Sequence, residues 1–342
     1  MQTHYSEDHR RHCPRQELHG GEMVPPFERP DRMDLILARL AERGFPAPVA
    51  PGPVEMAPVE RLHDGGYLAF LRDAWAEWLA EGFTGEIVAA NYPARRMQTA
   101  RPPRNIDGKV GYYALASETA ITEGTWAAAL SSVACAQAAT REVAGGARSA
   151  FALCRPPGHH AARDMFGGYC FVNNAAVAAE ILVQAGARPA VLDIDFHHGN
   201  GTQDILWSRG DIFFASIHGQ PEDAFPYFLG HADETGAGAG EGATANFPLP
   251  PGTRFGPWGA ALDAALAGLR RWGADALVVS LGVDAYREDP ISFFRLDSAD
   301  FSEAGRRLGR AGLPTVFCME GGYAIDAIGV NTVNVLEGFL GR

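Results

Sequence analysis

The segment AVLDIDFHHGNGTQ, residues 190–203, places acids and histidines at the end of a run of β-forming residues. Asp193, Asp195 and His197 occupy alternate positions, and alternate side chains of a strand lie on the same side of it. A buried carboxylate without a partner is costly. A bound divalent cation would remove that cost, and Asp and His are both ordinary zinc ligands. The segment therefore predicts a metal site at the end of a buried strand.

A third metal ligand must come from elsewhere in the chain. Asp284 follows another apolar run in the segment ALVVSLGVDAYREDP. Two aspartates and one histidine leave one coordination position open, which is typical of catalytic rather than structural sites. Taken one at a time, Asp193 and Asp195 also fit a hydrogen-bonded strand end, and Asp284 fits a loop acid. As a set, Asp195, His197 and Asp284 favour a catalytic metal centre.

Two further motifs follow apolar runs. In ALCRPPGHHA, the rigid turn at 156–158 presents His159 and His160. Adjacent histidines can be a metal pair, an acid/base pair or a chance surface doublet, and the rigid turn favours a chemical role. In CMEGGYA, two glycines precede Tyr323, which could donate a hydrogen bond to a developing oxyanion. Most tyrosines are packing or surface residues, so this motif alone is weaker.

Other histidines are expected to have no chemical role. His198 faces away from His197 on the alternation argument and is predicted to support the site from behind its ligands or to be structural, and His218, which ends an apolar run, is predicted to be structural. His4, His9 and His12 are predicted to form a solvent-exposed cluster.

The elements that must position these residues alternate between short apolar strands and helices, which indicates a parallel sheet covered on both faces. In such folds ligands bind beyond the carboxyl ends of the strands, where the chemically capable residues fall. Residues 1–30 are predicted to be loops and 84–112 to be irregular. Strands are predicted at 149–154, 189–195, 212–218, 276–282 and 314–320. Helices are predicted at 31–43, 66–81, 124–143, 173–186, 258–273 and 300–312.

Composition excludes several classes of protein. The 342 residues carry a net charge of −12, which argues against non-specific binding to nucleic acid or anionic membranes and is compatible with a cationic small substrate. The five cysteines are dispersed without a CxxC motif, which predicts a reducing cytoplasmic location and no disulfide framework. No apolar run reaches the ~18 residues of a membrane span. A single α/β domain covering residues 1–342 is expected.

The motifs RPPGHHA, GGYCFVNNAAVAA, LDIDFHHGNGTQDI and MEGGY resemble the zinc-dependent deacetylase family, which includes histone deacetylases, acetoin-utilisation proteins and acetylpolyamine amidohydrolases. The resemblance runs from about residue 4 to the C-terminus. The segments GGEMVPPFE, GYYALASETAITEGTW and DPISFF are most similar to the bacterial acetylpolyamine amidohydrolases. The resemblance implies the arginase/deacetylase α/β fold, a parallel β-sheet flanked by helices with long active-site loops.

The resemblance also implies roles for individual residues. One Zn²⁺ would be bound by Asp195, His197 and Asp284, with Tyr323 polarising the scissile carbonyl. His159 and His160 would be the tandem histidines, paired with Asp193 and Asn200 respectively. A structural K⁺ would be held by Asp193, Ser216 and Ile217, together with the backbone of Asp195 and His197. Tyr169, Phe225 and Gly168 would line the acyl channel.

Substrate preference is expected to depend on the rim of the site. Asp107 and Glu118 lie where the polyamine enzymes carry gate acids, although each also fits an ordinary loop or helix-start charge. The segment 14–30 resembles the loop through which those enzymes dimerise and narrow the site, so a homodimer is expected.

The predicted function is removal of acetyl groups from acetylated polyamines such as acetylputrescine or acetylcadaverine, with acetylspermidine and acetylspermine as further candidates, releasing acetate and free amine. An acetyl-lysine peptide deacetylase is the main alternative. A two-manganese ureohydrolase on the related arginase fold and a non-catalytic acyl-ligand sensor are less favoured, because the chain carries a complete one-metal set of ligands, tandem histidines and tyrosine.

Overall fold

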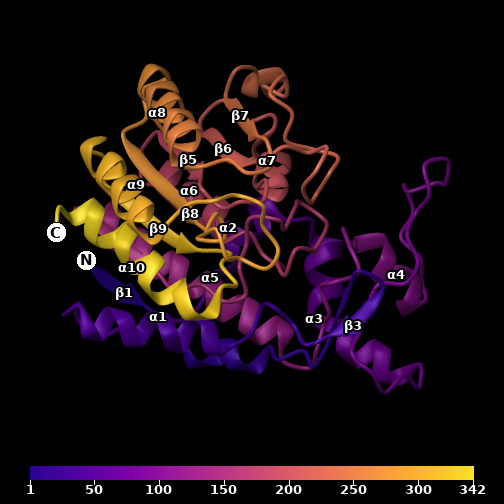
Figure 1. Ribbon diagram of the computed structural model, residues 1–342. Coiled ribbons are helices and arrows are strands. Elements are labelled where there is room, and N and C mark those ends of the chain that lie inside the picture. Colours follow the sequence, from indigo (N-terminus) through magenta and orange to yellow (C-terminus); the bar gives the residue numbers. More distant parts are fainter.

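The computed structural model describes residues 1–342 and is built on a seven-stranded, all-parallel sheet (Figure 1). The strand order is β1-β4-β9-β8-β5-β6-β7. Its strands are β1 (Gln2–His4), β4 (Ser149–Ala152), β5 (Pro189–Asp193), β6 (Phe213–Gly219), β7 (Thr244–Leu249), β8 (Ala276–Leu281) and β9 (Thr315–Met319). A separate antiparallel hairpin pairs β2 (Glu17–His19) with β3 (Glu22–Val24).

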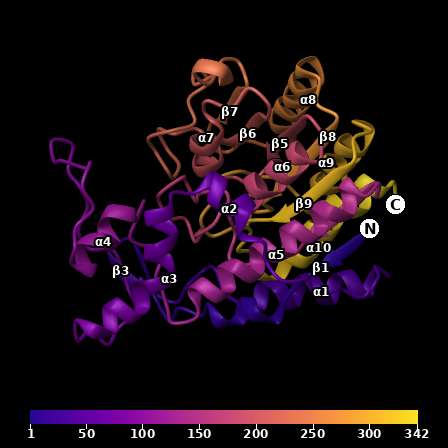
Figure 2. The ribbon, with the colours of Figure 1, turned by 180° about the vertical axis from the view of Figure 1, so that it is seen from behind.

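Helices cover both faces of this sheet, as the alternating pattern predicts, and Figure 2 shows the arrangement from behind. The helices are α1 (Asp31–Glu42), α2 (Met56–Leu62), α3 (Gly65–Ala80), α4 (Ile106–Tyr113), α5 (Thr125–Ala144), α6 (Asn174–Gln184), α7 (Asn200–Leu206), α8 (Phe255–Trp272), α9 (Ser298–Arg310) and α10 (Ile325–Leu340). Local sequence sets where some begin. The Asp64 carboxylate accepts from the first N–H groups of α3, and Asp297 and Asp300 form a capping box at α9.

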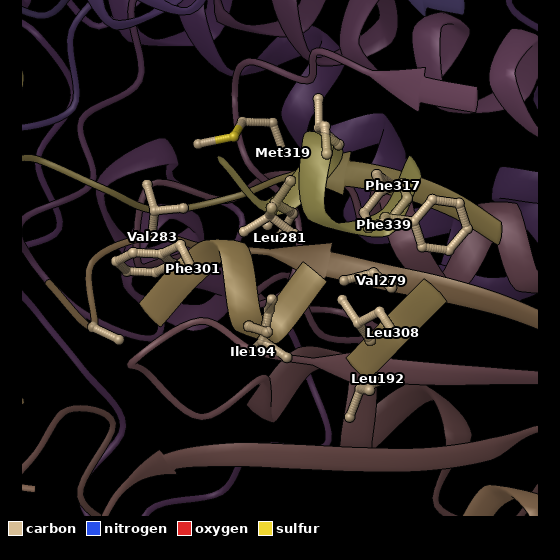
Figure 3. Close-up of a cluster of buried hydrophobic side chains, with 14 of the residues drawn as sticks. Leu192, Ile194, Val279, Leu281, Val283, Phe301, Leu308, Phe317, Met319 and Phe339 are labelled. Carbon is tan, nitrogen blue, oxygen red and sulfur yellow. The ribbon is translucent and has the colours of Figure 1, made fainter. Parts of the chain in front are cut away.

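The core divides along the two faces of the sheet. Alternate residues of β9 show the division: Phe317 and Met319 pack with α9 and α10 on one face (Figure 3), whereas Val316 and Cys318 pack with α5 and α6 on the other. Because strand side chains alternate, fully apolar strands are required when both faces are buried. The carboxyl ends of the strands are thereby fixed at one edge.

A third apolar cluster lies outside α5 and α6. It joins α2, α3 and α4 around Phe166 and Phe171. Figures 1 and 2 both show α3, α4 and β3 on one side of the molecule, away from α8 and α9. This layer places the hairpin β2–β3 beside the loops that follow the strands.

The predicted strands and helices of the α/β core are confirmed, with ends that differ by a few residues. The prediction for residues 1–30 was wrong, because this segment contributes β1 to the sheet and the hairpin β2–β3. Helix α4 also interrupts the segment 84–112 that was expected to be irregular, and four further elements were not predicted: α2, α7, β7 and α10. No helix combines the length and apolarity needed to cross a bilayer.

The predicted solvent-exposed histidine cluster is also wrong. His4, His9 and His12 are all buried. His9 Nε2 lies 3.0 Å from the Tyr5 hydroxyl, and His12 Nδ1 lies 2.9 Å from Thr125 Oγ1. Burial lowers the pKa of His12 to about 3, so this ring is neutral at physiological pH. The burial of His4 and His12 could not be seen in the local sequence, because their partners Glu142 and Thr125 lie far along the chain.

Candidate metal centre and active site

The acids and histidine of the opening motif lie just beyond the end of a strand. β5 ends at Asp193, so the predicted continuation of the strand to residue 195 does not occur. Instead, the Asp195 N–H donates to Asp193 Oδ1 (3.0 Å), and the His197 N–H donates to Asp195 Oδ1 (2.9 Å). Two successive side-chain-closed turns thus replace the strand, and they still bring the three residues together.

Asp195, His197 and Asp284 converge, with their ligand atoms within 4.8 Å of one another and all three residues buried. His197 Nδ1 lies 2.9 Å from Asp284 Oδ2 and 3.2 Å from Asp195 Oδ1. Backbone donors orient the carboxylates: the Phe196 N–H binds Asp284 Oδ1 (2.7 Å) and the Gly321 N–H binds Asp195 Oδ2 (2.8 Å). These donors aim the remaining lone pairs at a common point.

The charges at this point fit a divalent cation. Burial and repulsion from Asp195 raise the pKa of Asp284 well above its usual range. Burial disfavours charge on His197, but hydrogen bonds to Asp195 and Asp284 outweigh it and raise the pKa of the metal-free ring to about 10, so a bound cation would have to displace the ring proton. Two buried carboxylates facing one imidazole form a nitrogen- and oxygen-donor set that suits zinc. A cation there would relieve the repulsion between the acids.

The tandem histidines have different hydrogen-bond partners. His159 Nδ1 lies 2.9 Å from Asp193 Oδ2, whereas His160 Nδ1 lies 2.6 Å from Asn200 Oδ1. Burial opposes charge on His159, but attraction to Asp193 and Asp195 raises its pKa to about 10. Burial, together with repulsion from His159 and His197, lowers the pKa of His160 well below its usual value. One ring is therefore cationic and the other neutral, a division typical of acid/base sites.

Tyr323 reaches the site because two glycines precede it. A side-chain carbon at Gly321 would lie 2.6 Å from Asp195 Oδ2, and one at Gly322, whose φ is +133°, would lie 2.6 Å from Val283. The Tyr323 N–H donates to Asp289 Oδ2 (2.8 Å), which fixes the turn. Burial raises the pKa of the Tyr323 phenol well above its ordinary value, so the hydroxyl remains a hydrogen-bond donor.

A buried ion network behind Tyr323 was not predicted from the sequence. The Arg32 guanidinium lies 4.9 Å from the centre of the Tyr323 ring and donates to the Gly322 carbonyl (2.8 Å). Arg32 and Arg155 both donate to Glu28 Oε1 at 2.8 Å. Attraction from the two arginines overcomes the burial of Glu28 and lowers the pKa of this acid to about 2. The i,i+4 spacing of Glu28 and Arg32 is visible in the sequence, whereas nothing in the sequence links either residue to Arg155.

A cavity of about 460 Å³ opens onto this chemistry. His160, His197 and Tyr323 line it, together with the predicted channel residues Gly168, Tyr169 and Phe225. Gly168 has a φ of +54°, and a side-chain carbon there would lie 2.1 Å from His160 Cδ2, so the position requires glycine. The Phe225 and His160 rings lie 5.1 Å apart, and those of Tyr169 and Tyr323 lie 5.6 Å apart. Aromatic rings thus wall the approach to the metal ligands.

Acids also line the cavity. Glu118 does so as expected, and its Oε1 accepts from the Gly168 N–H (2.8 Å). Glu17 and Asp223 line it too, although the sequence did not single them out. Glu17 Oε1 accepts from the Tyr169 hydroxyl (3.0 Å), and burial raises the pKa of Glu17 to about 7. Asp107 is not among the lining residues, and its carboxylate accepts from Asn91 Nδ2 (2.8 Å).

The residues implied for K⁺ lie behind the metal ligands. Asp193 and Ser216 are direct partners across β5 and β6, and Ile217 follows Ser216 in the strand. Ser216 Oγ lies 2.8 Å from Nδ1 of His218. His198 and His218 are buried and hydrogen-bonded away from the cavity, as expected of structural residues.

Comparison with known proteins defines the class. Residues 26–339 match the family model described as the histone deacetylase domain, and the chain belongs to this family. The family is zinc-dependent, in agreement with the buried Asp/His cluster.

Full-length relatives lie in one branch of the family. The acetylpolyamine amidohydrolase of Mycoplana ramosa is 54% identical over 100% of both chains. Acetylpolyamine amidohydrolase 1 of Pseudomonas aeruginosa is 52% identical over 100% of this chain and 99% of the relative. The crystal structure of the acetylpolyamine aminohydrolase of Burkholderia pseudomallei is 40% identical and superposes with a TM-score of 0.93, covering 99% of this chain and 98% of that one.

Proposed function

We propose that this protein is a zinc-dependent amidohydrolase that removes the acetyl group from acetylated polyamines and releases acetate and the free amine. One observation carries the proposal: His197 of the candidate metal-ligand set, His160 and Tyr323 line a single cavity that acids also line. The names of the full-length relatives above 50% identity support the same substrate class.

Bound zinc would supply Lewis-acid polarisation of the amide carbonyl and activation of the attacking water. The chain's own residues move the protons. Because Asn200 engages Nδ1 of His160, Nε2 of the neutral ring takes the proton from water and then returns it to the leaving amine nitrogen. Tyr323 donates its hydroxyl hydrogen to the carbonyl oxygen as negative charge develops there. His159, held cationic by Asp193, stabilises the negative charge that develops on the carbonyl oxygen.

The cavity lining supports a polyamine substrate. Tyr169 and Phe225 provide apolar walls for an alkyl chain, and Glu17, Glu118 and Asp223 provide negative charge for distal ammonium groups. A neutral acyl-lysine side chain carries no ammonium group inside such a channel. The acids are therefore the feature that favours a polyamine over a peptide.

We also propose the finer features implied by the resemblance. A structural K⁺ would be held by Asp193, Ser216 and the main chain of Ile217, Asp195 and His197. One deacetylase domain would span residues 1–342, because β1 and β9 share the sheet. A homodimer formed through residues 14–30 is supported by apolar side chains exposed there and near the cavity: Leu18, Met23, Tyr227 and Phe228.

The test is a substrate panel on metal-defined protein. Acetylputrescine and an acetylated histone peptide are compared at one zinc per chain, and higher kcat/KM on acetylputrescine is expected. A strong preference for the peptide would overturn the polyamine assignment. A requirement for two manganese ions would instead support a ureohydrolase, and absence of zinc-dependent turnover would support a ligand sensor.

A further inference from the structure

One buried acid has no part in the mechanism above. Glu320 follows β9 directly, is fully buried and does not line the cavity; it lies beside His159 and Cys170 and is separate from the candidate zinc ligands Asp195, His197 and Asp284. Its Oε2 accepts from the backbone N–H groups of Gly158 (2.6 Å) and His159 (3.2 Å), while Oε1 has no hydrogen-bond partner. A buried carboxylate is thus committed to the turn that presents the tandem histidines.

The direction of the Glu320 side chain follows from the strand before it. Phe317 and Met319 point toward α9 and α10 (Figure 3), and Cys318 points to the opposite face. Continuing that alternation directs Glu320 to the face shared with Cys318. The histidine turn follows β4, the neighbour of β9 in the sheet. The Glu320 side chain therefore reaches from the end of β9 to the histidine turn that follows β4.

Glu320 connects the two halves of the active site. Its side chain holds the turn that carries His159 and His160, and Tyr323 lies three residues after it in the chain. The main chain of this second turn is fixed independently, because Arg32 donates to the carbonyls of Glu320 (2.7 Å) and Gly322 (2.8 Å). The separation between the base and the tyrosine is then set by a rigid link through the Glu320 side chain.

We propose that Glu320 is a positioning residue that sets the placement of His160 relative to Tyr323 by accepting the two N–H groups of the histidine turn. This inference rests on the proposed function. It acts through geometry, since one oxygen at the correct reach is required and the negative charge is not. A displacement of about 1 Å at a reacting group can cost about 10²-fold in rate.

Three substitutions separate geometry from charge. Glu320→Gln keeps an oxygen at the same reach without charge, Glu320→Asp keeps the charge with a shorter reach, and Glu320→Ala removes the acceptor. The kcat of Glu320→Gln is expected to be within about threefold of wild type. The kcat of Glu320→Asp and Glu320→Ala is expected to be lower by about 10²-fold, with KM changing little. Glu180→Gln is the matched control and should keep wild-type kcat. Glu180 is a buried acid on α6 that is paired with Arg209.

Other outcomes overturn the proposal. Wild-type kcat in Glu320→Asp and Glu320→Ala would show that no positioning is needed. High activity in Glu320→Asp with loss of activity in Glu320→Gln would assign the effect to charge. If Ala does not fold, the comparison of Gln with Asp still decides. A second readout is the proton NMR signal of the His159–Asp193 hydrogen bond, which is expected to shift less in Glu320→Gln, where only the charge changes, than in Glu320→Asp, where the turn moves. This signal reports on Glu320 even if the wild-type protein has no amidohydrolase activity, so failure of the proposed function is recognised separately.

Discussion

His160 Nδ1 lies 2.6 Å from the Oδ1 atom of Asn200, so this histidine is paired with a neutral amide, whereas its neighbour His159 is paired with the carboxylate of Asp193. The amide fixes the tautomer of His160 without favouring its protonated form. The burial of His160 and the cationic ring of His159 beside it then keep it neutral. The difference between an amide and a carboxylate partner thus favours His160 as the base in the proposed mechanism.

Asn200→Asp is expected to raise the pKa of His160, because a carboxylate at this distance stabilises the imidazolium. The base must be neutral, so the acidic limb of the kcat/KM profile should move to higher pH by at least about one unit. The pH–rate profile measures the shift. A profile that superposes on wild type would argue against His160 as the base.

Tyr323→Phe removes the hydroxyl that donates to the developing oxyanion. Loss of one such donor typically lowers kcat by about 10²–10³-fold, and KM should change little. Zinc content, measured alongside the kinetics, should remain at the wild-type value because the phenol is not a ligand. Near wild-type turnover with zinc bound would refute the role of Tyr323.

Removal of zinc by a chelator is expected to abolish turnover and to lower the Tm, because ligand binding stabilises the folded state and its loss leaves Asp195 and Asp284 in mutual repulsion. Calorimetry with and without zinc measures this shift. Asp284→Asn should bind less zinc and show a smaller shift. Asp223→Asn is the control, because Asp223 is an exposed acid at the cavity. It should bind as much zinc as the wild type and show the same zinc-dependent shift in Tm.

Glu17→Gln is expected to raise KM for acetylputrescine by about tenfold, a loss of ~1.4 kcal/mol in binding a cation. KM for the uncharged N-butylacetamide should not change. The pKa of Glu17 is about 7, so in the wild-type enzyme KM for the cationic substrate should also rise as pH falls through 7. Equal effects on both substrates would show that Glu17 does not recognise charge.

The neutral buried histidines predict how stability depends on pH. The pKa of His12 is about 3 when folded, below the value near 6.5 expected when unfolded. The unfolded chain therefore takes up a proton that the folded protein excludes. The contribution of His12 is fully present above pH 6.5 and falls by up to about 1.4 kcal/mol per pH unit as pH decreases toward 3. The free energy of unfolding, measured with urea at several pH values, should depend less steeply on pH for His12→Gln than for wild type. An unchanged pH dependence would contradict the burial of a neutral ring.

Residue types at strand ends predicted that Asp195, His197 and Asp284 would converge near the tandem histidines, because parallel strands bring their carboxyl ends to one edge regardless of how far apart they lie in the chain. The loops of Asp195 and Asp284 therefore meet although they lie far apart in the chain. The Phe196 N–H donates to the carboxylate of Asp284, which is 88 residues away. Glu28 and Arg32 have the i,i+4 spacing of helical neighbours, but the pairing of Glu28 with Arg155, 127 residues away, follows no such rule. Glu28 and Arg155 both lie in irregular segments, and single-sequence patterns carry no information on which loops touch.

The parallel pairing of Gln2–His4 with Ala150–Ala152 has a consequence for biosynthesis. β1 is translated before α1 to α5, yet the strand it must join, β4, is translated only after them. Arg155, which donates to the carbonyls of His9 and His12, appears later still. The nascent N-terminal segment must therefore stay unpaired during much of translation, and the histidine turn can reach its final form only once that segment has docked.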